Sequence, residues 1–146
     1  MIESLRRLAL TAGGAMLAVS LATASAQAAA PAKVTPLAKL DATITGQPIV
    51  TPSGPHQVVA SIVELPVGGR LAPHKHPFPR YVYVLSGQLR VTYFDAKLVK
   101  EFKAGEFAAE AVDQWHMGEQ VGTEPVRLLV VDHVPAGQAN VVMRPD

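Results

Sequence analysis

The chain has 146 residues, with 13 Lys and Arg against 12 Asp and Glu, and it contains no Cys. The length is that of one domain and excludes a two-domain enzyme, and the near-neutral charge excludes binding to nucleic acid or anionic lipid through bulk charge. The missing thiols exclude disulfides, thiolate metal sites and Cys nucleophiles, so any metal must be held by His and carboxylates, and the five His become the residues of interest.

The N-terminus has the three parts of a secretory signal peptide. Arg6 and Arg7 precede the apolar stretch 8–24, and the small residues of Ala24-Ser25-Ala26 follow it. The stretch is too weakly apolar for a spanning helix. We therefore predict a signal peptide at residues 1–26, a periplasmic or secreted mature protein, and no stable membrane partner after cleavage. An uncleaved membrane anchor and a twin-arginine export signal are the alternatives.

After the leader, we predict an extended N-terminal segment at 27–36 and a single domain at 37–146. Runs rich in Val, Leu, Tyr and Phe, separated by Gly or Pro, predict seven or more strands in this domain. These runs lie at 56–65, 80–85, 88–94, 98–102, 106–112, 126–134 and 139–143. No stretch after residue 36 keeps a helical period for ten residues, so the sequence predicts an all-β barrel or sandwich.

The segment between the first two predicted strands contains a closely spaced pair of His residues. His74 and His76 are separated by one residue, so on extended backbone both imidazoles point to the same side and can bind one ion. The alternative is a solvated loop pair beside Lys75. The flanking spacing favours the metal site: five residues separate Gly68 from His74, and ten residues separate His76 from Gly87, which ends the motif.

This spacing resembles the first motif of the cupin superfamily, G-x₅-H-x-H-x₃₋₄-E-x₆-G. A second cupin motif, G-x₅-P-x-G-x₂-H-x₃-N, is similar to the run from Gly105 to Gln120, in which Gly105 and His116 are the identical residues. The resemblance covers roughly residues 58–134. It implies a double-stranded β-helix, which is a conical jelly-roll barrel with the site in its mouth, and a homodimer.

The resemblance implies that His74, His76 and His116 bind one divalent metal ion, which could be Fe, Mn, Zn, Ni or Cu. Arg80 stands where the family has a Glu ligand, and a guanidinium cannot coordinate a cation. Three hypotheses follow. The three-His site survives and Arg80 binds an anionic substrate or pairs with a nearby carboxylate; Glu110 replaces the missing ligand, because a buried carboxylate needs a cationic partner; or the metal is lost and Arg80 forms an anion-binding pocket.

Other aromatic and His residues are candidates for a place near the site. Trp115 adjoins the third His and could wall the pocket or plug the end of the barrel. We expect one of Tyr81 and Tyr83 to face inward, with a core role for Tyr83 ahead of a substrate contact. His56 and His133 lie outside the motifs, and we expect an exposed loop position for the first and a structural role for the second.

The function that follows is that of an exported metal-binding protein. Three protein ligands leave coordination positions open, which favours dioxygenase- or isomerase-like chemistry on a small-molecule ligand, an anionic organic acid. The alternatives are a non-catalytic periplasmic module that binds or senses a small ligand or the metal, and a structural dimer without activity. The sequence has no nucleophile elbow, no phosphate loop and no run of alternating basic and aromatic residues, which excludes serine hydrolase, nucleotide-binding and nucleic-acid-binding functions.

Overall fold

The structure is a computed structural model that describes residues 29–145. Residues 34–145 belong to one compact unit, and residues 29–33, which belong to another, are exposed and have no regular structure. The predicted signal peptide lies outside the described residues. Among these residues there is no helix that could span a membrane.

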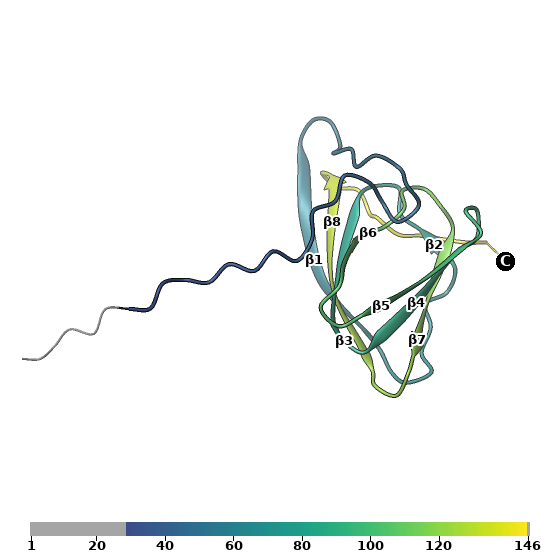
Figure 1. Cartoon of the computed structure of the whole chain (residues 1–146). Coiled ribbons are helices and arrows are strands. Elements are labelled where there is room, and N and C mark those ends of the chain that lie inside the picture. Colours follow the sequence, from purple (N-terminus) through teal and green to yellow (C-terminus); the bar gives the residue numbers. More distant parts are fainter. Residues whose placement is uncertain (1–28, 146) are drawn as a thin grey trace, which may run out of the picture. The chain divides into compact units, whose positions relative to one another are not determined.

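The named elements of the unit at 34–145 are all strands, and they form two sheets that are opposite walls of a barrel (Figure 1). The first sheet has the order β1-β8-β3-β6 and the second β5-β4-β7-β2-β9, and the strand pairs within both sheets are antiparallel. The strands are β1 (His56–Leu65), β2 (His74–Lys75), β3 (Arg80–Ser86), β4 (Gln88–Tyr93), β5 (Leu98–Lys103), β6 (Phe107–Ala109), β7 (His116–Val121), β8 (Val126–Pro135) and β9 (Val142–Met143).

The core lies between the two sheets, because successive side chains of a strand point to opposite faces. In β8 buried residues alternate with more exposed ones along the whole strand, and β4 shows the same alternation. Burying each Val or Leu side chain contributes about 1.5–3 kcal/mol. The buried cluster consists of Leu65, Val82, Val84, Leu89, Val91, Tyr93, Ala111, Val126, Leu128 and Val130.

The all-β prediction is confirmed for the described residues, and each of the predicted strands overlaps an observed one. Two observed strands, β2 and β7, were not predicted, and they carry His74 and His116. β2 has only two residues. In β7 the buried positions are His116, Gly118 and Gln120, so the apolar alternation that marks a strand is absent there.

At two of the motif positions, the backbone conformation explains which residue is found there. Gly87, in the turn between β3 and β4, has a φ of 74°, and a Cβ there would lie 2.5 Å from the carbonyl oxygen of Pro125. Asp113 stands where the second motif has a Gly, and it adopts a φ of 56°. Asp tolerates this left-handed backbone better than most residues do, so the turn before β7 keeps its shape.

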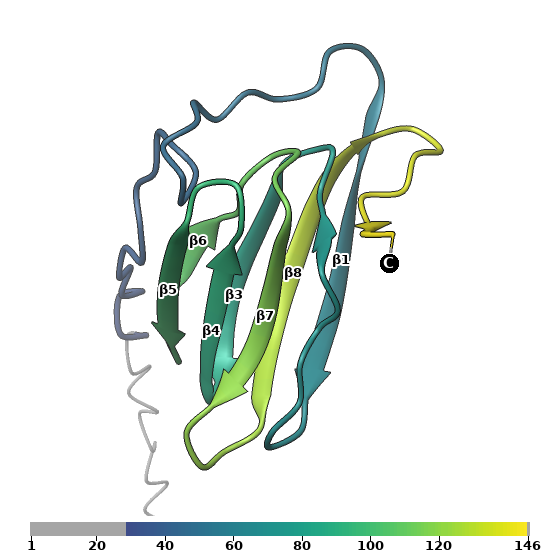
Figure 2. The same cartoon turned by 90° about the vertical axis from the view of Figure 1, so that its right-hand side faces the viewer.

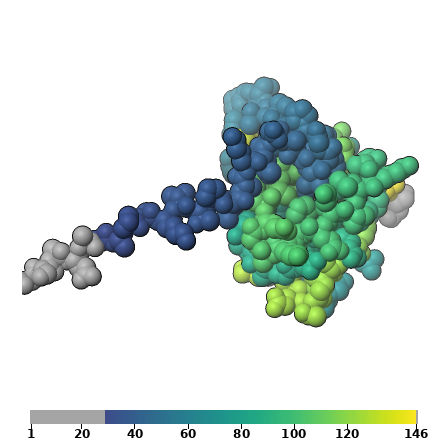
Figure 3. Space-filling view, in the orientation of Figure 1, coloured from purple at the N-terminus to yellow at the C-terminus, as the bar shows by residue number. Residues whose placement is uncertain are grey.

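A segment ahead of β1 packs against the residues that follow β6. The side-chain amide of Gln47 makes two hydrogen bonds of 2.9 Å with the backbone N and O of Val112, and the backbone N of Ile44 donates to Ala109 O. Val112 in turn forms a parallel bridge with His76. The space-filling view shows this dark blue segment lying against the green residues of the barrel (Figure 3).

Candidate metal centre

Three His side chains meet inside the barrel. His74 in β2 is the Cα partner of His116 at the start of β7, and His76 follows two residues after the first. Their exposed fractions are 6%, 0% and 2% for His74, His76 and His116. One ligand atom from each lies within 4.8 Å of the others. The structure thus brings together the three residues that the sequence singled out.

Each of the three imidazoles has its Nδ1 beside a backbone carbonyl. A carbonyl oxygen can only accept a hydrogen bond, so Nδ1 carries the proton in each ring. The neutral imidazole then has its lone pair on Nε2, which is the tautomer that a metal ligand requires. The acceptors for His74, His76 and His116 are the carbonyl oxygens of Ala72, Asn140 and Gln114, at 2.8, 2.6 and 3.0 Å.

Glu110 follows β6, and its carboxylate lies beside the Nε2 atoms of two of these rings. Its Oε2 is 2.9 Å from His76 Nε2 and 3.5 Å from His116 Nε2, and the side chain is 11% exposed. Because the Nδ1 protons are committed to carbonyls, neutral rings offer Oε2 no proton, and the buried oxygen has no hydrogen-bond partner among the described residues. Three Nε2 atoms and a carboxylate oxygen therefore converge, with the Arg80 guanidinium near His76 Nε2 and no hydrogen-bond partner for the carboxylate oxygen among the described residues, and this set of electron-pair ligands fits a divalent cation.

The pKa shifts of the ionisable groups in the site indicate an environment that favours a cation. Burial is the main cause that lowers the pKa of His74 to about 4, so this ring is neutral at physiological pH. Burial opposes ionisation of Glu110, but contacts with His116 and His76 outweigh it and hold the pKa of that carboxyl well below its usual range. Burial likewise opposes charge on His116, yet the neighbouring carboxylate raises the pKa of that ring. An ionised carboxylate among imidazoles attracts a cation.

Arg80 enters the same space but is held by a different acid. Its Nε and Nη2 donate to Asp132 Oδ1 and Oδ2, both at 2.7 Å, and this pair is mostly buried. Its Nη1 lies 3.3 Å from His76 Nε2. The planar fork that could clamp a substrate carboxylate is therefore already occupied. Of the two roles left open for Arg80, the structure shows pairing with a nearby carboxylate, and that carboxylate is Asp132 rather than Glu110.

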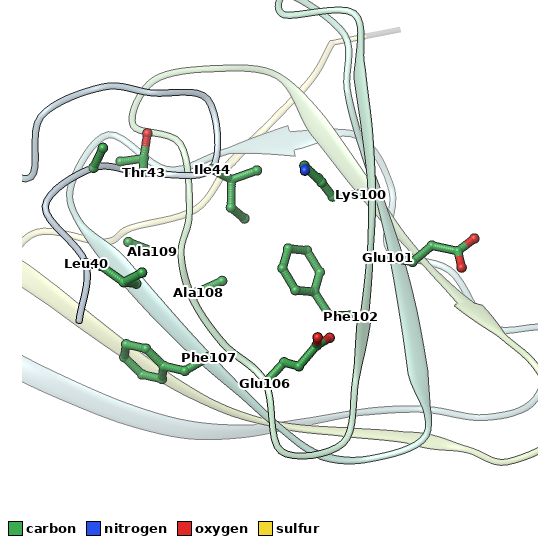
Figure 4. Close-up of a pocket in the computed structure, with 11 residues that line it drawn as sticks. Leu40, Thr43, Ile44, Lys100, Glu101, Phe102, Glu106, Phe107, Ala108 and Ala109 are labelled. Carbon is green, nitrogen blue, oxygen red and sulfur yellow. The ribbon is translucent and has the colours of Figure 1, made fainter. Parts of the chain in front are cut away.

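His74 and His116 border a small cavity. It has a volume of about 20 Å³, room for about one water molecule. Polar residues of the site and apolar residues from both sheets line it: Val63, Leu71, His74, Arg80, Val82, Leu89, Val91, Glu110, His116, Gly118, Leu128 and Val130. Figure 4 shows a wider groove of about 390 Å³ between residues 40–44 and strands β5 and β6, but its lining contains no His.

Other residues considered from the sequence lie away from the cavity. Val82 and Val84 are buried, so Tyr83 between them projects from the other face of β3 together with Tyr81; the expectation that one of the two faces inward is wrong, because residues two apart share a face. Trp115 does not line the cavity. Its ring lies 5.0 Å from the Lys75 ammonium.

The two remaining His residues contact each other at the β1–β8 edge. His56 is exposed as expected, but it begins β1 and does not lie in a loop. The ring centroids of His56 and His133 are 4.4 Å apart in an edge-to-face arrangement. This contact gives His133 a packing role on the strand.

Three residues of the site were missed in the sequence. Asp132 occupies an inward position in the apolar run of β8, and this break in the alternation was a usable signal. Tyr93 is fully buried, and its ring lies 5.1 Å from that of His116. Asn140 binds His76 from a segment 64 residues away, and no local pattern marks it.

Comparison with known proteins gives a family match. Residues 61–132 match the family model of the cupin domain. No curated protein matches the chain. One similar solved structure is the oxalate decarboxylase of Lactobacillus farciminis in complex with formate, with a TM-score of 0.52 and 27% identity, covering 59% of this chain. This chain covers only 26% of the length of that enzyme.

Two further structures show likeness of fold alone. The polyketide cyclase RemF of Streptomyces resistomycificus matches with a TM-score of 0.52 and 21% identity. The match covers 64% of this chain and 66% of the RemF chain. An uncharacterised protein with a double-stranded β-helix domain from Klebsiella pneumoniae matches with a TM-score of 0.50 and 24% identity. The match covers 67% of this chain and 87% of the Klebsiella chain.

The Arg80–Asp132 pair generates a stability prediction. Asp132→Asn keeps the shape of the side chain but leaves a buried guanidinium without its counter-charge, so we expect a loss of about 3 kcal/mol in the free energy of unfolding. The matched control is Glu64→Gln, which breaks the exposed pair with Arg127 at 2.8 Å and should cost about 1 kcal/mol or less. Urea unfolding of both variants measures this, and equal losses would contradict it.

Proposed function

The chain belongs to the cupin superfamily, and on this basis we propose that it binds one divalent metal ion through His74, His76 and His116, with Glu110 as the fourth ligand. The observation that supports this most strongly is the convergence of three Nε2 atoms with a buried carboxylate oxygen that has no hydrogen-bond partner among the described residues. A site of this kind is costly to bury unless a cation fills it. Imidazole and carboxylate ligands suit Fe, Mn, Zn, Ni and Cu.

We propose further that the site acts on a small organic acid in a dioxygenase- or isomerase-like reaction. A bound ion would supply Lewis-acid or redox chemistry at its open coordination positions. Asp132 neutralises Arg80 at the border of the cavity, so the positive charge that would attract an anion is that of the bound ion. The similar Lactobacillus oxalate decarboxylase is in complex with formate, a one-carbon acid, which supports a ligand of few atoms.

A second candidate function is non-catalytic binding of the metal itself, in a binding or sensing module. The observation that favours it is the size of the cavity, about 20 Å³, which admits about one water molecule beside the ligands. An organic acid needs more room, so catalysis would require the barrel mouth to open. The two candidates differ in whether a small carboxylate changes the environment of the bound ion.

The metal proposal predicts the behaviour of ligand variants. His74→Ala, His76→Ala and His116→Ala should each abolish stoichiometric metal binding, and Glu110→Gln should weaken it, because Gln keeps the shape but loses the charge. His56→Ala, at the β1 edge, is the matched control and should bind like the wild type. Elemental analysis and titration with Mn(II) and Zn(II) measure occupancy and affinity. Full occupancy in any of the three His variants would disprove the ligand set.

Formate added to the Mn(II)-loaded protein separates the two candidate functions. Direct interaction of the acid with the ion should alter the electron paramagnetic resonance spectrum of Mn(II), as expected for a site open to organic acids. An unchanged spectrum at saturating formate would favour the non-catalytic module.

We also propose that the protein is exported to the periplasm or secreted, with residues 1–26 as its signal peptide. The support is the sequence pattern of basic, apolar and small residues at the N-terminus. Mass spectrometry of protein recovered from the export compartment should find Gln27 or Ala29 as the first residue. An exported protein that retains Met1 or Ile2 would disprove cleavage.

We propose that the protein forms a homodimer with β1 at its interface. β1 is an edge strand of ten residues that contains neither Pro nor Lys to protect its edge, and Val58, Val59 and Ile62 are 61%, 40% and 49% exposed. Antiparallel pairing of two copies about a two-fold axis at Ala60 would place Val58 opposite Ile62 and His56 opposite Glu64, so no like charges meet.

The dimer proposal predicts that a charge on β1 separates the subunits. Ile62→Lys should shift the protein to monomer in sedimentation velocity, because two ammonium groups would be buried at the interface. Val67→Lys, at an exposed apolar residue outside the strands, is the control and should leave the dimer intact. A monomeric wild type, or a dimeric Ile62→Lys variant, would contradict the proposed interface.

A further inference from the structure

The chain after β8 returns to β2, the strand that carries His74 and directly precedes His76. β9 pairs with β2, so that Met143 is opposite His74 and Val142 opposite Lys75. The backbone N of Arg144 donates to Pro73 O at 2.9 Å. Figure 2 shows this C-terminal segment turning back beside the top of β1 and β8. The segment 136–144 is therefore attached to the site by its own strand pairing.

Asn140, in this segment, is buried and connects three parts of the site. Its backbone oxygen accepts from His76 Nδ1 at 2.6 Å. Its side-chain Oδ1 accepts from the backbone N of Phe78 at 2.8 Å, and its Nδ2 donates to Asp132 Oδ1 at 2.6 Å. Both ends of the amide are thus used, and a carboxylate or an aliphatic side chain could not make the same set of bonds.

The three imidazoles differ in how their Nδ1 protons are held. His74 and His116 each donate to the carbonyl of the residue two positions earlier in their own segment. His76 instead donates to a carbonyl 64 residues away. The orientation of this ring therefore depends on the tertiary placement of Asn140, whereas the other two rings are oriented by local backbone.

We propose that Asn140 is the positioning residue of the metal site. It fixes the tautomer and direction of His76 through its backbone oxygen, and its side-chain amide holds that oxygen in place by tying the segment to Phe78 and Asp132. Through Asp132, which binds Arg80, it also restrains the guanidinium next to His76 Nε2. This inference rests on the proposed metal function and adds a residue that acts on a ligand without touching the ion.

Metal affinity is the first measurement. Asn140→Ala removes both side-chain bonds, and Asn140→Asp keeps the shape but places a carboxylate against Asp132, so both variants should bind Mn(II) and Zn(II) about 10- to 100-fold more weakly than wild type in calorimetric titration. Gln138→Ala, an exposed residue of the same segment, is the matched control and should bind like the wild type. Unchanged affinity in a folded Asn140→Ala variant would overturn the proposal.

The second measurement determines the tautomer of His76. If the role of Asn140 were merely structural, its substitution would leave this tautomer unchanged. Nitrogen-15 NMR of the metal-free wild type should show the proton on Nδ1, slow to exchange, and Asn140→Asp should show faster exchange or a mixed tautomer at His76 with His74 and His116 unchanged. A wild-type ring protonated on Nε2 would overturn the proposal even if both variants fail to fold. A wild type that binds no metal but shows the expected tautomer would instead disprove the proposed function.

Discussion

The centre of this barrel buries four electron-pair acceptors, and among the described residues the Glu110 oxygen has no hydrogen-bond partner. The Nε2 atoms of His74, His76 and His116 and the carboxylate of Glu110 face one another, while all three Nδ1 protons are spent on backbone carbonyls. Such a group is unfavourable in an apolar core unless a cation neutralises it. The surrounding structure serves this constraint, since β2 and β7 bring the rings together and apolar residues from both sheets line the cavity beside them.

The position of the carboxylate explains how the site accommodates Arg80. The backbone N of Glu110 donates to Arg80 O at 2.9 Å, so the two residues are neighbours across adjoining segments of the first sheet. A base thus stands where the first cupin motif has an acid, and the acid Glu110 reaches the imidazoles from the adjoining segment. Asp132 then neutralises the guanidinium, which leaves the Glu110 carboxylate to the imidazoles.

The strands whose buried side chains are aliphatic could be predicted from the sequence. The strands whose buried side chains are polar could not. β3, β4 and β8 have regular apolar alternation, whereas β7 turns His116 and Gln120 inward and so lacks the pattern. The three His could be named from motif spacing, because the motif places them on short extended segments. The partner of Arg80 could not, since Asp132 lies 52 residues away and depends on the pairing of β3 with β8.

The central claim is that three imidazoles and the Glu110 carboxylate bind one ion, and X-ray absorption spectroscopy of the metal-loaded protein tests it most directly. The account predicts a first coordination shell with three imidazoles and oxygen ligands, and the loss of a carboxylate oxygen signal in Glu110→Gln with the three imidazoles retained. A shell with fewer than three imidazoles would contradict the account. A spectrum unchanged by Glu110→Gln would contradict the role of the carboxylate.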